Sequence, residues 1–164
     1  EDDENEKDDI AQKVAVAALK YTELSHQAHV DYIFDLDKMT QFEGKTGPYI
    51  LYQTVRIKSL LRKADYKPSK DTAFILKDED RDLALVLSSF EDAFRLTVDN
   101  LAPHHLFDYA YKLASAFSRF YGNCHIMSEP NEELKQSRLA LSALTANILV
   151  KVLGMSGIDV PERM

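Results

Sequence analysis

Glycine and proline are scarce in this chain, and this scarcity constrains the fold more than any other feature of the sequence. Only five residues of each type occur among 164. Both types interrupt regular structure, so the long stretches between them can form continuous helices. Within these stretches apolar residues recur every three to four positions, which is the period of an amphipathic helix. The sequence therefore predicts an all-α protein.

Five main helical segments follow from this pattern, and their apolar faces predict an antiparallel helix bundle. We expect a corner after Ser88, where Ser89 and Asp92 resemble a capping box that starts the helix again. Gly122 and Gly154 are expected to end the last two helices. The expected segments are residues 10–24, 48–64, 78–88 continued as 90–100, 103–121 and 131–153.

The net charge of −7 is concentrated at the start of the chain. Residues 1–9 contain seven acids and one lysine, which accounts for six of the seven net negative charges. Like charges repel and offer nothing to bury, so this acidic head is expected to be disordered, as a solvated linker or a frayed helix start. The rest is close to neutral and contains a basic strip at 56–70. Such a strip suits either a solvated helix face or contacts with nucleic-acid phosphates.

Cysteine usage and hydropathy restrict the class of protein. A single cysteine, Cys124, excludes an internal disulfide, and we expect it to be a small buried hydrophobe. His104, His105 and His125 lack the paired spacing of a zinc site, so no metal or cofactor is expected here. No apolar run has the length of a membrane span, and the acidic start is unlike a secretory signal. We therefore expect a single-domain cytoplasmic protein without a membrane partner.

A glycine-punctuated loop at 41–48 leads directly into a helix that begins with aromatic residues. The loop lacks the leading glycine of a Walker motif, so it is not predicted to bind a nucleotide triphosphate. Tyr49, Tyr52 and Arg56 follow on one side of the helix. Aromatic platforms and a cation can read unstacked RNA bases, whereas tyrosines at these positions would also suit a packed core. The residues alone leave both interpretations open.

Three separated stretches resemble arginyl-tRNA synthetases, in the same order along the chain. They are FEGKTGPYILYQTVRIKSLLRKA at 42–64, FDYAYKLASAFSRFYGNC at 107–124 and the final PERM. The resemblance extends over about residues 13–164. It implies an anticodon-binding helix bundle at 46–164, preceded by a connection at 10–45 from the end of a catalytic domain. The segment that names the DALR type of this domain is written Asp-Tyr-Ala-Tyr here, which departs from the name.

The resemblance also implies a binding surface for the anticodon loop of tRNA(Arg), whose middle base is cytosine. Tyr49, Tyr52 and Arg56 would form its centre, and Arg62 would contact the RNA backbone. From spacing alone, Tyr121 would instead continue an apolar core face. The complete implied set is Gln41, Phe42, Gly44, Tyr49, Tyr52, Arg56, Arg62, Tyr121, His125 and Met164.

No catalytic residues are expected in this chain. The adenylate-binding histidine-glycine-histidine signature of the family is absent, because no glycine separates His26 from His29. Lys38 is not a match for the lysine loop of class I synthetases, since in this family the matching segment lies just before the anticodon-binding bundle. The resemblance thus implies a non-catalytic piece, truncated on its N-terminal side, of an enzyme that attaches arginine to tRNA with ATP and Mg²⁺.

Two other functions fit the composition. A helical protein-interaction module with no RNA role would explain the acidity and the amphipathic helices, although it leaves the loop, the tyrosines and the PERM ending unexplained. A cysteinyl-type synthetase domain is a third possibility, and the FEGKTGPY loop favours the arginyl branch over it. We expect a monomer in each case.

Overall fold

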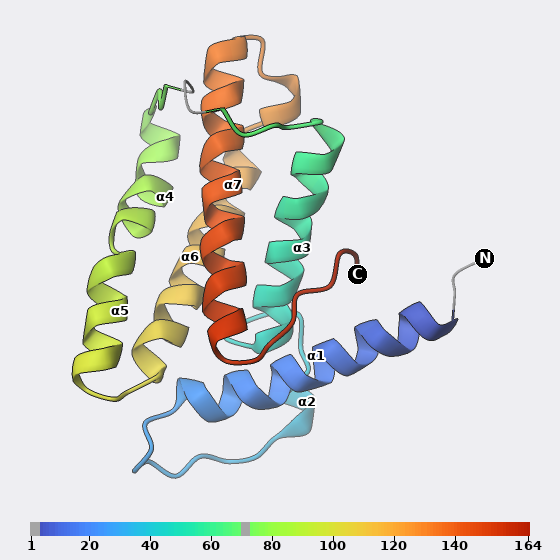
Figure 1. Cartoon of the computed structure of the whole chain (residues 1–164), viewed down its shortest axis with the longest axis vertical. Coiled ribbons are helices and arrows are strands. Elements are labelled where there is room, and N and C mark those ends of the chain that lie inside the picture. Colours follow the sequence, from blue (N-terminus) through green and yellow to red (C-terminus); the bar gives the residue numbers. More distant parts are fainter. Residues whose placement is uncertain (1–3, 70–72) are drawn as a thin grey trace.

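The computed structural model describes residues 4–69 and 73–164, and every regular element within them is helical (Figure 1). This finding confirms the all-α prediction for the described part of the chain. The elements are α1 (Glu4–Ser25), α2 (Leu36–Met39), α3 (Gly47–Lys63), α4 (Asp78–Ser88), α5 (Phe90–Asp99), α6 (His104–Asn123), the 3₁₀ helix η1 (Ile126–Ser128) and α7 (Glu132–Met155).

Four helical rods form the body of the protein and run alternately up and down, which confirms the antiparallel bundle (Figure 1). The rods are α3, the pair α4 and α5, then α6 and α7. The last helix, α7, contacts α3, α4 and α6. The first helix, α1, crosses one end of the bundle and packs against α3 and α6. The lower ends of α3 and α7 therefore lie next to α1 and to the C-terminal tail.

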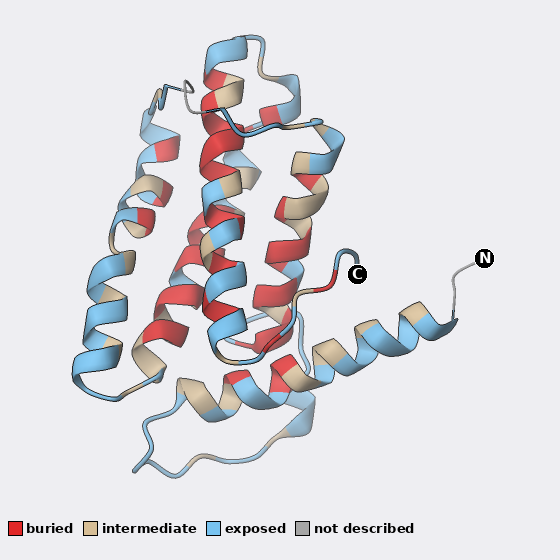
Figure 2. Cartoon of the chain, viewed as in Figure 1, coloured by how far each residue is buried: buried red, intermediate tan, exposed pale blue. Residues whose placement is uncertain are grey.

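The core lies on the facing sides of α3, α6 and α7, whereas α5 has no buried residue (Figure 2). Among its largest fully buried side chains are Tyr21, Phe107 and Phe117. The ring of Tyr21 meets that of Phe107 edge-on, with centroids 5.3 Å apart. This contact joins α1 to α6. Aromatic pairs in this arrangement stabilise a protein by more than the burial of their surface alone.

Most helix ends lie within two residues of the predicted ones, except for the start of α1. The expected stops at Gly122 and Gly154 are wrong, because both glycines lie inside their helices, which continue to Asn123 and Met155.

Asn131 caps α7 by accepting a hydrogen bond from the backbone N–H of Leu134 at 3.0 Å. The predicted capping box of Ser89 and Asp92 is wrong. The hydroxyl of Ser89 donates instead to the carbonyl of Val86 at 2.9 Å, so it satisfies the end of α4 and leaves α5 without a side-chain cap.

The disordered acidic head expected over residues 1–9 is wrong for its described part, because α1 begins at Glu4. Two acids lie in the first turn, where the helix dipole favours negative charge. Asp9 also pairs with Lys13 one turn later, at 2.6 Å. Repulsion between the acids is therefore offset by interactions within the helix. Residues 1–3 lie outside the described part of the chain.

Helix α7 is the one described helix that is long and apolar enough, by length and composition, to cross a membrane. Half of that stretch is buried inside the protein, as in the core helix of a bundle. Its buried positions include the polar residues Ser137, Arg138, Ser142 and Thr145. We therefore interpret α7 as the central helix of the bundle.

Candidate functional site

The loop that precedes α3 is fixed by side-chain contacts. Gly44 has a φ of 73°, in the left-handed region that favours glycine. The hydroxyl of Thr46 donates to the carbonyl of Gln41 at 2.6 Å and so closes the loop. Lys45 forms an ion pair with Asp108 of α6, which ties the loop to the bundle. The predicted glycine loop thus presents one defined surface beside the start of α3.

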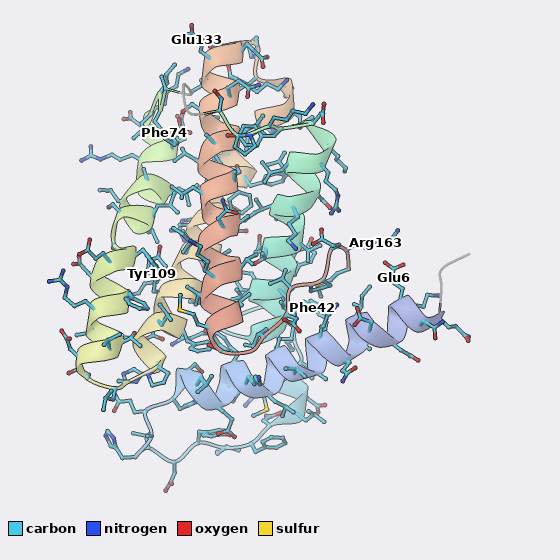
Figure 3. All side chains as sticks on the ribbon, viewed as in Figure 1. Glu6, Phe42, Phe74, Tyr109, Glu133 and Arg163 are labelled. Carbon is cyan, nitrogen blue, oxygen red and sulfur yellow. The ribbon has the colours of Figure 1, made fainter. Side chains whose placement is uncertain are left out.

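Three of the predicted binding residues meet in one apolar hollow of about 400 Å³. They are Phe42 from the loop, Tyr52 from α3 and Met164 from the C-terminal tail, and Ile10 and Val14 of α1 complete the lining. Each of the three is between 42% and 48% exposed, although all are large apolar or aromatic residues. Figure 3 labels Phe42 between the C-terminal tail and α1. The chain thereby holds an open apolar surface that its own core does not cover.

Arg56 lies one helical turn after Tyr52 and stacks on a second predicted residue. Its guanidinium carbon is 4.2 Å from the ring centroid of Tyr121. The same ring also packs against Phe117, with centroids 5.8 Å apart. Tyr121 therefore packs against the core residue Phe117 and also holds the cation of Arg56, in a cation–π contact worth ~0.5–2 kcal/mol. The interpretation of Tyr121 as a core residue therefore applies in part, and its contact with RNA stays a prediction.

A second, smaller hollow of about 180 Å³ lies further along α3. Tyr121 lines it together with Leu60 of α3 and His125, which is exposed at the start of η1. The two hollows lie towards opposite ends of α3, with the stacked Arg56 and Tyr121 between them. We call this surface the α3 face, defined by Phe42, Tyr52, Arg56, Tyr121, His125 and Met164.

Four predicted residues lie outside the α3 face. Tyr49 is partly buried and packs against Tyr111 of α6, with ring centroids 5.8 Å apart. Gln41 and Gly44 line a separate hollow between the loop and α1. Arg62 is engaged by the C-terminal tail. The structure therefore brings together six of the ten predicted residues and places the others around them.

The C-terminal tail is fixed to α3 by ion pairs that sequence patterns did not indicate. Lys58 contacts the carboxylate of Glu162 at 2.6 Å, and Arg62 donates to the backbone carbonyl of the same residue at 2.9 Å. The hydrogen bond from Lys58 is the main reason why the pKa of Glu162 lies below its ordinary value. Any contribution of this shift to the stability of the fold is present above the ordinary pKa of a glutamate. It is lost as the pH falls through the lowered pKa of Glu162. These partners are about 100 residues apart in the sequence, so no local spacing could reveal them.

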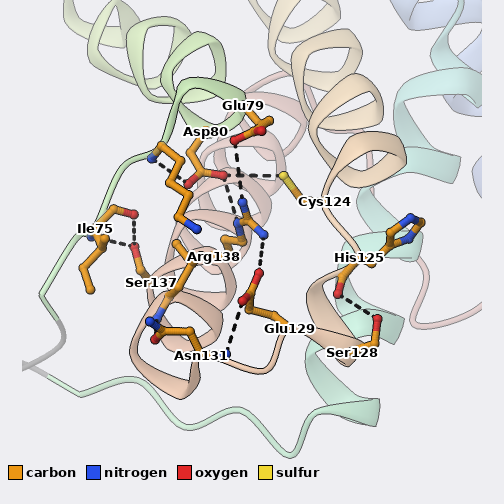
Figure 4. A network of polar contacts seen from close by, with 12 residues as sticks. Ile75, Glu79, Asp80, Cys124, His125, Ser128, Glu129, Asn131, Ser137 and Arg138 are labelled. Atoms are coloured by element: carbon orange, nitrogen blue, oxygen red, sulfur yellow. Dashed lines mark hydrogen bonds and ion pairs between the residues drawn. The ribbon is translucent and has the colours of Figure 1, made fainter.

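At the other end of the bundle, a buried ion network joins α4, α7 and the segment after η1 (Figure 4). The Nε of Arg138 donates to Asp80 at 3.0 Å, and its Nη1 donates to Glu129 at 2.9 Å. Arg138 is 6% exposed and Asp80 is fully buried. The sequence analysis missed this network, although an arginine among the apolar residues of the last helix was a signal for it.

Cys124 is buried beside this network, as predicted, and its surroundings disfavour a nucleophile. Burial raises the pKa of its thiol to about 11, so little thiolate is present near neutral pH. Its sulfur lies 3.5 Å from a carboxylate oxygen of Asp80. Within residues 4–69 and 73–164, no group of three or more His, Cys, Asp or Glu side chains is arranged to hold a metal ion.

Comparison with known proteins identifies the family. Residues 50–164, well over half of the chain, match the DALR anticodon binding domain. The chain belongs to the DALR anticodon-binding domain family. The match to the DALR domain includes α3 from its fourth residue onward, η1 and the tail, so it covers the whole α3 face except Phe42.

Curated proteins similar to this DALR chain are arginine–tRNA ligases. One from Agathobacter rectalis is 45% identical over 170 residues, which is 99% of this chain and 28% of the relative. Another from Maricaulis maris is 43% identical over 156 residues, or 94% of this chain and 26% of the relative. The chain thus spans a little over a quarter of the length of these relatives.

Solved structures agree with the sequence comparisons. The arginyl-tRNA synthetase of Thermus thermophilus matches 94% of this chain and 27% of its own, with a TM-score of 0.86 and 29% identity. That of Plasmodium falciparum matches 96% of this chain and 28% of its own, with a TM-score of 0.86 and 32% identity. The arrangement of the DALR bundle and of the helix before it is therefore shared with these synthetases.

Proposed function

We propose that this chain recognises the anticodon loop of tRNA(Arg), as the non-catalytic part of an arginine–tRNA ligase. One observation carries the proposal: Phe42, Tyr52 and Met164 form an open apolar hollow one helical turn from the guanidinium of Arg56. Bases of an anticodon loop can leave their stack and be read by aromatic and cationic groups. The α3 face supplies both kinds of group, and the membership of the DALR family supports this use of it.

Each residue of the α3 face has a distinct expected role. Tyr52 and Phe42 would stack on unpaired bases, each base contributing ~1–3 kcal/mol. Arg56 would read a base edge or a phosphate, and its stacking on Tyr121 keeps the guanidinium pre-positioned. Met164 would provide an adaptable apolar contact in the same hollow. His125 would bind at the second hollow, beside Tyr121.

The residues outside the α3 face would support it. Gly44 and Gln41 shape the loop that carries Phe42. Tyr49 packs on Tyr111 and would set the position of the first turn of α3. Arg62 would contact the RNA backbone only by exchanging its bond to the tail for one to phosphate.

Our proposal for the intact protein extends to its chemistry and location. The complete ligase would attach arginine to tRNA(Arg) using ATP and Mg²⁺, and the residues for that step would lie outside this chain. We infer a cytoplasmic location, which the buried, unpaired thiol of the single cysteine supports, and a monomer as the oligomeric state. The DALR match favours the proposed function over a helical protein-interaction module, which would show no preference among RNAs.

Binding of tRNA(Arg) by the full chain tests this proposal, with a transcript changed at the middle anticodon base as the control RNA. Tyr52→Ala should weaken binding of tRNA(Arg) by roughly tenfold and reduce discrimination between the two RNAs, since a stacked base contributes ~1–3 kcal/mol. Fluorescence anisotropy measures both affinities, and circular dichroism should report an unchanged fold because Tyr52 is exposed.

Phe74→Ala is the matched control, since Phe74 is an exposed aromatic residue near α4, away from the α3 face (Figure 3). It should leave both affinities unchanged. Equal binding of the two RNAs by the unaltered chain would refute anticodon recognition. Equal losses from Tyr52→Ala and Phe74→Ala would refute the assignment of the α3 face.

A further inference from the structure

The C-terminal tail after α7 is anchored at both of its ends. Near its start, the side chain of Ile158 is 1% exposed and belongs to the core. Lys20 of α1 donates to the carbonyls of Ser156 and Gly157 at 3.1 and 2.8 Å. Further on, Pro161 is also buried. The tail therefore follows one path from α7 towards α3 (Figure 1).

Glu162 is the point at which this path reaches α3. Its carboxylate accepts from Lys58 at 2.6 Å and lies 3.5 Å from Arg62, while its backbone carbonyl accepts from Arg62 at 2.9 Å. The next residue, Arg163, donates to Glu6 of α1 at 2.6 Å. The tail is thereby held between α3 and α1, with Met164 in the hollow beside Tyr52.

The contacts of Glu162 with α3 position the tail, but they contribute little to the stability of the fold because they are exposed. The side chains of Glu162 and Arg62 are 75% and 51% exposed, and ion pairs at such positions contribute little to the free energy of unfolding. A hydrogen bond to the backbone carbonyl of Glu162 nevertheless fixes the direction of the chain. Losing these contacts would free the last residues of the tail without unfolding the bundle.

We propose that Glu162 is a specificity-positioning residue, which holds Met164 in the α3 hollow by anchoring the tail to Lys58 and Arg62. This inference rests on the proposed recognition of the anticodon loop and adds a residue to it. Its role is indirect and is exerted through Met164. Without the Glu162 carboxylate, the pairing with Lys58 is lost, and the last two residues are held only by the bond from Arg62 to the backbone carbonyl and by the pair of Arg163 with Glu6.

The opposite consequence is the competing outcome of the test. Glu162 pairs with two cations of the basic strip, Lys58 and Arg62, and an RNA phosphate could take the place of its carboxylate. In that case its removal would free Lys58 and Arg62 and strengthen the binding of every RNA alike. If Glu162 positions Met164, its removal lowers the affinity for tRNA(Arg). If it instead blocks Lys58 and Arg62, its removal raises the affinity for every RNA.

The test compares Glu162→Ala, Met164→Ala and the double variant, in the full chain, with tRNA(Arg) and the transcript changed at the middle anticodon base. Glu162→Ala should lower affinity for tRNA(Arg) by about two- to tenfold, the range of a methionine–aromatic contact. Affinity for the changed transcript should stay constant. The double variant should lose no more than Met164→Ala, because both changes remove the same contact.

Asp159→Ala is the matched control. It removes one negative charge from the same tail, and Asp159 forms no ion pair with α3 in the part of the chain that the structure describes. It should leave both affinities unchanged. Thermal unfolding should give similar midpoints for all the variants, which excludes a merely structural effect.

Three results would overturn the inference. They are tighter binding of both RNAs by Glu162→Ala, losses that add in the double variant, or full discrimination retained by Glu162→Ala. Each of these can occur while the unaltered chain still prefers tRNA(Arg). Failure of the proposed function would instead appear as equal binding of the two RNAs by the unaltered chain, so the two failures are distinguishable.

Discussion

Arg138 is the residue on which the far end of the bundle depends most. Its guanidinium contacts carboxylates from α4 and from the segment after η1, so three parts of the chain converge on one side chain. Asp80 has no exposure to solvent, and a buried carboxylate without its partner is strongly destabilising. The network therefore determines how η1, and the hollow lined by His125, are held against α7.

We expect Arg138→Ala to lower the free energy of unfolding by about 3–5 kcal/mol, because it leaves the Asp80 carboxylate buried without its ionic partner. Urea denaturation measures the change. Arg81→Ala is the control, since Arg81 is exposed on the same helix as Asp80. A loss below about 1 kcal/mol would mean that water replaces the guanidinium at this site.

The sequence indicated which residue types line the candidate site better than it indicated where each side chain points. Tyr49, Tyr52 and Arg56 share a helix side, yet Tyr49 packs on α6 while Tyr52 stays exposed. Helical spacing defines a face only within one helix, and the neighbours of that face come from distant segments. Met164 shows this limit, because its partners Phe42 and Ile10 lie more than 100 residues earlier.

At the scale of elements, capping and periodicity predicted the main helices within a few residues. The prediction failed for segments whose conformation depends on contacts with distant parts of the chain, or which are too short for a pattern to appear. The acidic start of α1 is helical, and the short helices α2 and η1 have too few residues for a period to appear. The tail has no periodicity at all, and its path depends on ion pairs with α3 and α1.

The junction of α1 and α3 predicts a stability effect for the first residue of α3. A Cβ atom on Gly47 would lie 2.1 Å from the carbonyl oxygen of Ala17, so a larger residue must push the two helices apart. Gly47→Ala should therefore destabilise the chain by ~1–3 kcal/mol, the usual effect of overpacking. Hydrogen exchange should become faster in α1, whose packing is disturbed.

Gly122→Ala provides the control for this prediction. Gly122 lies inside α6, and among residues 4–69 and 73–164 no atom other than those of its chain neighbours and of the helix's own backbone lies within 4 Å of a Cβ built there. This change should be neutral or stabilising by up to ~1 kcal/mol, because alanine favours a helix. Equal effects of the two substitutions would contradict the close approach of α1 and α3.

For the whole molecule, local charge matters more than net charge. The chain carries −7 overall, but six of these charges lie in its first nine residues. The cations near the α3 face are partly neutralised by the tail, since Glu162 engages Lys58 and Arg62. Lys63 forms no ion pair within the described residues and stays exposed. Few cations are thus free to meet RNA phosphates.

RNA affinity should therefore fall with salt, but with a shallow slope of about −1 to −2 in a plot of log K against log salt concentration. Lys63→Ala should reduce this slope by about 0.7, the value for one phosphate of a single strand. Lys151→Ala on α7 is the control and should leave it unchanged. Affinity that does not depend on salt would contradict phosphate contacts by the basic strip.

The close contact between Ala17 and Gly47 has a mechanical consequence. Helix α1 has 22 residues and is therefore ~33 Å long, and its second half is part of the bundle core. No side chain separates it from the start of α3 at that point, so the two helices cannot slide past each other without losing core packing. Helix α1 would thus move with the start of α3 as one rigid body, so that a displacement of the α3 face would be carried along α1 as far as its first turn at Glu4.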